Sequence, residues 1–393
     1  MTGIRWFTRV QLALLGSGFF VNLINFSVYP YLAVLLRDRM SLGMDQVGLI
    51  LGLATFLQFA GGLPGAALAE RLGLQRCLLV AMVLQTLGSL GFLVGGAWPA
   101  LTIAALFLRS AASAVYSPSV RGYTVLGATP DERPRLVSAS YATGNVGIAL
   151  GPVAGALFIH DPAAMFAVAT ALHVAMTIGH AYLPTERGDK QEAVEPLRRA
   201  LNGTAVLPFA VTALTLYLHM HFYQYLSSYA QGRVPAVFYG SAMMAYSLIL
   251  AVIQPLISTW VERMRYPHAM ALGFGGQAVG MLAFTVGNEI AIAAGILAIG
   301  AGNSVIFLKN VLEALARTQR SPTVVFGQQR LAEGAGAFLS GLAGGGLYHL
   351  FESIGNLPGF WLAIAAQCLL LPPIVLLADR MLRRPTLEPA GVS

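Results

Sequence analysis

The residues best suited to chemistry are a few charged side chains inside long apolar segments. Arg109 lies in one such segment, and Arg330 and Glu333 lie in another, three residues apart. Residues at this spacing share a helix face, so the guanidinium and the carboxylate would be neighbours. Burial favours the neutral form of a carboxylate and a nearby cation favours the charged form, a balance suited to proton uptake and release. We therefore expect Glu333 to take part in proton coupling.

Arginine keeps its proton in proteins, so Arg109 would bias the protonation of a neighbour or bind an anionic group. Its alternative role is structural, holding carbonyl groups at helix ends. Lys309 and Glu313 are four residues apart in a third apolar segment. With Arg330 and Glu333 they would form either a coupling network or a static clamp between helices. The candidate proton-coupling residues are Arg109, Lys309, Arg330 and Glu333.

Aromatic and polar side chains alternate over residues 217–225, which is typical of a wall that binds an organic ligand. The predicted cavity residues are Asn22, Asn25, Tyr29, His219, Tyr223 and Gln224. Hydrogen bonding between helices is the alternative role for each of them. His219 and His221 point about 200° apart on a helix and cannot share a metal ion, so no metal or cofactor is expected. His219 could instead accept a proton.

The composition shows what kind of elements must position these residues. Of 393 residues, 56% are hydrophobic and 10% are charged, whereas a soluble domain has about 25% charged residues. This excludes a soluble enzyme, a disordered chain and a nucleic-acid-binding domain, and predicts an all-α membrane protein. No HExxH, GxSxG or Walker motif occurs, so an enzyme is not expected.

Twelve apolar stretches are long enough to span a bilayer. They cover residues 10–36, 45–68, 76–97, 99–123, 136–158, 164–182, 206–230, 237–260, 267–286, 291–315, 326–350 and 359–382. Most Lys and Arg residues fall in the loops on one side, against Arg37, Arg39 and Arg233 on the other. The positive-inside rule then places both termini in the cytoplasm, in a bacterial-type inner membrane. The polar segment 184–205 divides the chain into six-helix bundles at 1–183 and 206–393.

The two halves repeat each other at an offset of about 190 to 194 residues. The segment 68–72 corresponds to 260–264, and the pair Asn25 and Tyr29 corresponds to His219 and Tyr223. Such a duplication is typical of two bundles that rock about a binding site near the membrane midplane.

The chain resembles the major facilitator superfamily over essentially its full length. Residues 66–76 are similar to the family's G-x-L-a-D-r-x-G-r-k loop, with Ala66, Glu70 and the pair Leu74 and Gln75 as departures. Residues 106–109 are similar to the motif that carries an intramembrane arginine in proton-coupled members. Residues 147–155 match the G-x-x-x-G-P-x-x-G antiporter motif, with Ala156 in place of a final glycine. The gating and hinge residues implied by this resemblance are Glu70, Arg71, Gly73, Gly147, Gly151, Pro152 and Gly155.

This resemblance is greatest to the twelve-span drug:proton antiporters, and it implies a monomeric, proton-coupled exporter of an amphipathic or aromatic small organic molecule. Residues 7–37 contain no acid before Arg37, so the carboxylate that some multidrug antiporters carry in their first helix is absent. The alternative function is export of a siderophore or other metal-chelating metabolite, with Arg109, Arg330 and His219 against its carboxylates. The expected partners are the small organic substrate, protons and the lipid bilayer, and not nucleic acid.

Overall fold

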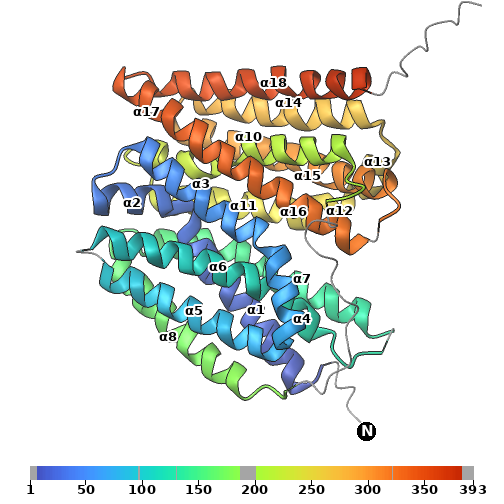
Figure 1. The fold of residues 1–393 in the computed structure, drawn as a ribbon. Coiled ribbons are helices and arrows are strands. Elements are labelled where there is room, and N and C mark those ends of the chain that lie inside the picture. Colours follow the sequence, from blue (N-terminus) through green and yellow to red (C-terminus); the bar gives the residue numbers. More distant parts are fainter. Residues whose placement is uncertain (1–6, 96–97, 130, 186–200, 321, 383–393) are drawn as a thin grey trace, which may run out of the picture.

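The computed structural model describes residues 7–95, 98–129, 131–185, 201–320 and 322–382, and the regular elements in these ranges are all helices (Figure 1). The first half contains α1 (Arg9–Val28), η1 (Tyr29–Tyr31), α2 (Leu32–Met40), α3 (Met44–Ala60), α4 (Gly62–Leu72), α5 (Leu74–Val94), α6 (Pro99–Thr124), α7 (Arg133–Leu157) and α8 (Pro162–Ala181). The second half contains α10 (Val206–Ala230), α11 (Ala236–Leu248), η3 (Ile249–Ile253), α12 (Gln254–Leu256), α13 (Ser258–Arg263), α14 (Tyr266–Phe284), α15 (Glu289–Ala316), α16 (Pro322–Leu339), η4 (Ser340–Gly344), α17 (Gly345–Ser353) and α18 (Leu357–Leu382).

These elements confirm the predicted fold class. Each predicted span lies on one helix or on a run of consecutive helical segments. Nine helices in the described ranges are long and apolar enough to cross a membrane. We call the side on which α8 ends and α10 begins the linker side, and the opposite side the far side. Most of the segment 184–205, predicted to divide the chain, lies outside the described residues.

Four of the predicted spans are not continuous α-helices. Pro30 lies in the 3₁₀ turn η1 between α1 and α2, because proline cannot donate the backbone hydrogen bond that would continue the helix. Gly61 separates α3 from α4. The π-helical turns η3 and η4 interrupt the eighth and eleventh spans, and such turns locally widen a helix, often at functional sites. Hydropathy alone does not detect these breaks, because the flanking residues remain apolar.

Close packing of α7 on α1 explains the glycines of the predicted antiporter motif. A Cβ added at Gly151 would lie 2.6 Å from the Cβ of Phe26, and Cβ atoms at Gly147 and Gly155 would overlap the carbonyl oxygens of Phe19 and Ser27. Small residues let helices approach in a membrane, where apolar burial alone does not drive helix association. The three glycines therefore lie in a contact within the first half and not between the halves.

The two halves meet along α3 with α16, η4 and α17, and along α7 with α11. Beside the second contact, and within the first half, the hydroxyl of Tyr31 donates to the carbonyl of Pro152 at 2.7 Å. A Cβ at Gly240 of the second half would lie 2.6 Å from the same carbonyl oxygen. Pro152 of the predicted hinge set thus lies at a contact between the halves.

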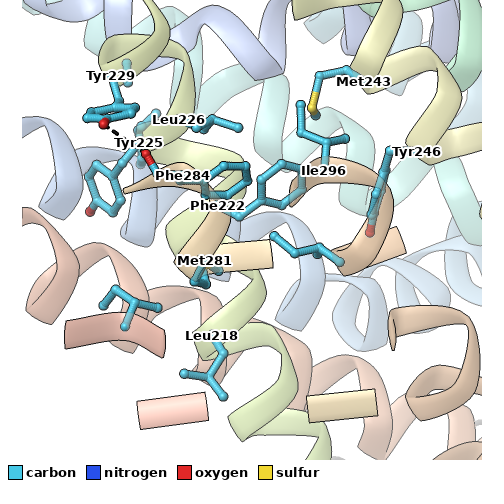
Figure 2. Packing of buried hydrophobic residues seen from close by; sticks show 14 of the residues in the cluster. Leu218, Phe222, Tyr225, Leu226, Tyr229, Met243, Tyr246, Met281, Phe284 and Ile296 are labelled. Carbon is cyan, nitrogen blue, oxygen red and sulfur yellow. Dashed lines mark hydrogen bonds between the residues drawn. The ribbon is translucent and has the colours of Figure 1, made fainter. Parts of the chain in front are cut away.

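The core of the second half is aromatic. Figure 2 shows Phe222 packed beside Phe284 and Tyr246, with ring centroids 6.1 Å and 5.4 Å apart respectively. The hydroxyl of Tyr229 donates to the carbonyl of Phe284 at 2.9 Å. These contacts hold α10 against α11 and α14, and so fix the helix that carries His219, Tyr223 and Gln224.

Candidate functional site

A cavity of about 440 Å³ lies between the two halves. Its walls come from α1, α3, α6 and α7 of the first half, and from α10, η3, α15 and α16 with neighbouring residues of the second. Most of the lining is aliphatic or aromatic, with amide and hydroxyl groups at intervals. A mainly apolar cavity with a few placed polar groups suits a medium-sized organic ligand.

Four of the six predicted cavity residues line this cavity: Tyr29, His219, Tyr223 and Gln224. The other two do not. The amide of Asn22 donates to the carbonyl of Gly18 on its own helix at 2.9 Å. Asn25 is 5% exposed and accepts a hydrogen bond from Arg109. Helical spacing places both asparagines on one side of α1, but that side packs against neighbouring helices.

Arg109 forms the centre of a buried polar cluster in the first half, which we call the arginine cluster: Asn25, Ser89, Arg109 and His173. Its guanidinium donates to Ser89 Oγ at 2.6 Å and to Asn25 Oδ1 at 2.7 Å. Ser89 Oγ also lies 3.0 Å from His173 Nδ1. Arg109 is 1% exposed and does not line the cavity. Its hydrogen bonds connect α6 with α1 and α5, and Ser89 extends this connection to α8.

A second buried cluster occupies the corresponding place in the second half. We call it the asparagine cluster: His219, Tyr246, Gln277 and Asn303. The Asn303 amide nitrogen lies 3.1 Å from both His219 Nδ1 and the Tyr246 hydroxyl, and Gln277 Nε2 donates to Asn303 Oδ1 at 2.6 Å. This pattern assigns Nδ1 of His219 as an acceptor, so the ring is neutral with its proton on Nε2. His219 and Tyr246 reach the cavity and stack with centroids 5.7 Å apart.

Arg330 and Glu333 form an ion pair on the cavity wall. Arg330 Nη1 lies 2.9 Å from Glu333 Oε2, and the two side chains are 42% and 26% exposed. The guanidinium also stacks over the ring of Phe59 at 5.3 Å. Among the described lining residues, Glu333 is the one carboxylate. The predicted pairing on α16 is therefore present, and it gives the wall a charge pair near the linker side.

The predicted pair of Lys309 and Glu313 is wrong. Lys309 Nζ donates to the carbonyl of Glu262 at 2.8 Å, and Glu313 Oε1 pairs with Arg317 at 2.6 Å. Arg317 also lies 3.6 Å from Asp379. A carboxylate has two possible partners four residues away, and here the arginine on its C-terminal side is the partner. Neither Lys309 nor Glu313 lines the cavity, so they do not form one network with Arg330 and Glu333.

The predicted gating loop, residues 66–76, covers the C-terminal part of α4, Gly73 and the start of α5. Arg71 is exposed in the last turn of α4, and Gly73 has a φ of 88°, which only glycine adopts readily, before α5 begins. For Glu70 the structure describes the backbone and not the side chain.

Contacts that close the far side were missed by the sequence analysis. Arg37 on α2 pairs with Glu352 on α17 at 2.7 Å, and Gln231 donates to Asp38 at 3.4 Å. Both bonds join the two halves. In the sequence Arg37 is only a topological marker, and no local pattern connects it with a residue over three hundred positions away. The role of Asn303 was also missed, although the repeat offset aligns it with Arg109.

Comparison with known proteins agrees with this architecture. The family profile described as Major Facilitator Superfamily matches residues 14–233, more than half of the chain. The chain belongs to the major facilitator superfamily. This confirms the resemblance found in the sequence and places the chain among transporters and not enzymes.

Relatives within the superfamily include a multidrug protein. The multidrug resistance protein MdtH of Salmonella typhi is 24% identical over 376 residues, covering 92% of this chain and 90% of MdtH. The uncharacterised MFS-type transporter Rv0849 of Mycobacterium tuberculosis is 31% identical over 159 residues. That match covers 39% of this chain and about a third of the relative, 36% of its length.

Solved structures share the fold at low identity. The nucleoside transporter NupG superposes with a TM-score of 0.76 at 12% identity, covering 96% of this chain and 100% of NupG. A POT peptide transporter in complex with sulfate superposes with a TM-score of 0.77 at 14% identity, covering 96% of each chain. These likenesses establish the arrangement of helices and leave the substrate open.

Proposed function

We propose that this protein is a proton-coupled exporter that moves an amphipathic or aromatic small organic molecule out of the cytoplasm by alternating access. The observation that carries the proposal is the cavity itself, which both halves line and which combines aromatic walls with few polar groups. The multidrug relative MdtH, matched over nearly the whole chain, supports an amphipathic substrate. We further propose a monomer in a bacterial-type inner membrane, with both termini cytoplasmic.

The arrangement of contacts supports an inward-facing state. Arg37 with Glu352, and Gln231 with Asp38, join the halves at the far side. The cavity lining, by contrast, continues along α16 to Gln329 in its linker-side half. Under the positive-inside rule the linker side is cytoplasmic. Substrate would enter from the cytoplasm, and separation of the far-side contacts would release it outside.

Glu333 is the carboxylate best placed to couple protons to this cycle. When it is ionised, it neutralises Arg330 on the cavity wall. Protonation would leave the guanidinium unpaired, so the charge of the cavity wall would change with the protonation state of Glu333. Arg109 and Lys309 would act as fixed charges in this mechanism, since neither reaches the cavity. Gly151 and Pro152 would transmit the movement of α7.

The alternative of a chelator exporter has less support. It required Arg109, Arg330 and His219 to face carboxylates of the substrate. Arg109 is enclosed in the arginine cluster, and Arg330 already has a carboxylate partner. The described lining of the cavity therefore offers no unpaired positive charge of the kind that an anionic chelator would need.

The test is transport into proteoliposomes with an acidic lumen. Three probes of similar shape separate the candidates: N-methylquinolinium, neutral 2-quinolinone and the chelating anion quinoline-2-carboxylate. Proton-coupled export predicts that a cationic or neutral probe accumulates in the lumen only when the pH gradient is present. In the Glu333→Gln variant, uptake should be the same with and without the pH gradient. The exposed Glu289→Gln is the matched control and should transport normally. Uptake that ignores the gradient would contradict proton coupling, and uptake of the anion alone would favour the chelator exporter.

A further inference from the structure

One buried amide on the cavity wall has no partner. Gln224 on α10 is 6% exposed and lines the cavity. Neither its Nε2 nor its Oε1 has a hydrogen-bond partner among the described residues. The hydroxyl of the preceding residue, Tyr223, is also buried, unpartnered and on the cavity wall. These two adjacent side chains thus carry an amide NH₂ group, an amide oxygen and a hydroxyl that have no hydrogen-bond partner among the described residues.

Such groups are costly in a membrane protein. Buried polar atoms are nearly always hydrogen-bonded, and leaving them unpaired in an apolar environment costs free energy. A leucine at position 224 would avoid this cost and would pack among the apolar residues of α10. Two buried amides nearby show the usual behaviour: Asn303 is held by three neighbours, and Asn310 on the cavity wall is bonded to Tyr266, Pro208 and Thr212.

The surroundings of Gln224 define the ligand chemistry. A carboxamide offers donor and acceptor side by side, and so it can make two parallel hydrogen bonds to a group that carries an adjacent acceptor and donor. The ring of Tyr223 lies 6.4 Å from Phe26 and 5.8 Å from His219, centroid to centroid. Aromatic rings at these distances form a wall for a planar group. The charged lining residues Arg330 and Glu333 already neutralise each other.

We propose that Gln224, with Tyr223 beside it, is a recognition subsite for a neutral planar group that carries adjacent N–H and C=O groups, as in a lactam or a cyclic amide. This inference rests on the proposed function, since it names the substrate class that the exporter takes. Gln224 would bind the N–H and C=O edge through its amide, the Tyr223 hydroxyl would bond a further polar atom, and the aromatic wall would hold the ring.

The test compares 2-quinolinone with N-methyl-2-quinolinone, which keeps the ring and the carbonyl but lacks the N–H. Equilibrium dialysis against the purified full-length protein gives both dissociation constants. We expect the N–H compound to bind at least about fivefold more tightly, the value of one hydrogen bond. Gln224→Leu should reduce this ratio to about one. Gln224→Met, which is closer in shape, serves if the leucine variant does not fold, and the exposed Gln46→Leu should keep the full ratio.

Thermal unfolding without ligand gives an independent readout. Because the amide is unpartnered, Gln224→Leu should leave the Tm unchanged or raise it, whereas loss of a structural hydrogen bond would lower it. The proposal is overturned if neither probe binds, if the two bind equally, or if the leucine and methionine variants keep the ratio. Dialysis involves no gradient, so failure of proton-driven transport with a normal binding ratio would refute the proposed function alone, and transport without the ratio would refute the subsite alone.

Discussion

The arginine cluster and the asparagine cluster occupy equivalent places in the two halves but differ in charge. Asn25 and Arg109 of the first align by the repeat with His219 and Asn303 of the second. In the first cluster the asparagine accepts from a permanent cation, and in the second a neutral asparagine bonds a neutral histidine. The two halves therefore connect their helices by hydrogen bonds at equivalent positions, but through side chains of different charge.

The difference determines what each cluster can do. Arg109 cannot lose its proton, so the arginine cluster has one protonation state at its centre. The asparagine cluster has two complete arrangements. Gln277 Oε1 has no partner among the described residues. If the side-chain amides of Asn303 and Gln277 both flipped, Asn303 Oδ1 would accept from His219, and Gln277 Oε1 would accept from Asn303. His219 could then hold a proton on Nδ1 without any loss in the number of bonds. The central group of the first cluster therefore cannot change its charge, whereas the hydrogen-bond count of the second would permit either tautomer of His219.

The same substitution in each cluster tests this difference, and the largest effect is expected in the first. Asn25→Leu leaves a guanidinium Nη of Arg109 buried without its acceptor. A hydrogen bond to a charged group contributes about 1.5–3 kcal/mol, so unfolding free energy in detergent should fall by that amount. The matched control is Asn22→Leu on the same helix, whose amide bonds only its own helix and should cost less than about 1 kcal/mol. Equal losses at the two positions would show that the guanidinium does not depend on Asn25.

Asn303→Leu should have the second largest effect. It orphans His219 Nδ1 and Gln277 Nε2, but both groups are neutral, so the loss should be about 1–2 kcal/mol. Adding His219→Leu removes one of the orphaned groups, and the double variant should lose less than the sum of the single variants. Exposed Asn202→Leu controls for the change in side chain. Strict additivity in the thermal unfolding data would mean that Asn303 and His219 are not coupled.

The fold could be predicted from the sequence because its signals do not depend on tertiary contacts. Apolar length, basic loops and the repeat are all readable without knowing which helices touch. Cavity residues on α10 were found because residues 217–225 carry an unusual alternation of aromatic and polar groups. Asn22 and Asn25 failed as cavity residues because the spacing of a helix shows which residues share a face, but not which neighbour covers that face.

Partner choice was the least predictable feature. Glu313 has a basic residue four positions away in each direction, and the structure pairs it with Arg317, which also lies 3.6 Å from Asp379 on α18. The ion pair of Arg37 with Glu352 joins residues whose proximity follows only from the tertiary fold. The internal repeat carries long-range information, because it aligns Asn303 with Arg109. That alignment could have identified Asn303 as a residue of the second cluster.

A smaller effect is expected where the two halves are alike. Tyr31 and Tyr225 align by the repeat; Tyr31 donates to the Pro152 carbonyl at 2.7 Å, and Tyr225 donates to the Gly341 carbonyl at 3.1 Å. Tyr31→Phe and Tyr225→Phe should each lower unfolding free energy by about 0.5–1.5 kcal/mol, the value of a neutral hydrogen bond. The exposed Tyr141→Phe should have no effect. Losses that differ several-fold between the two variants would show that the halves have diverged here as well.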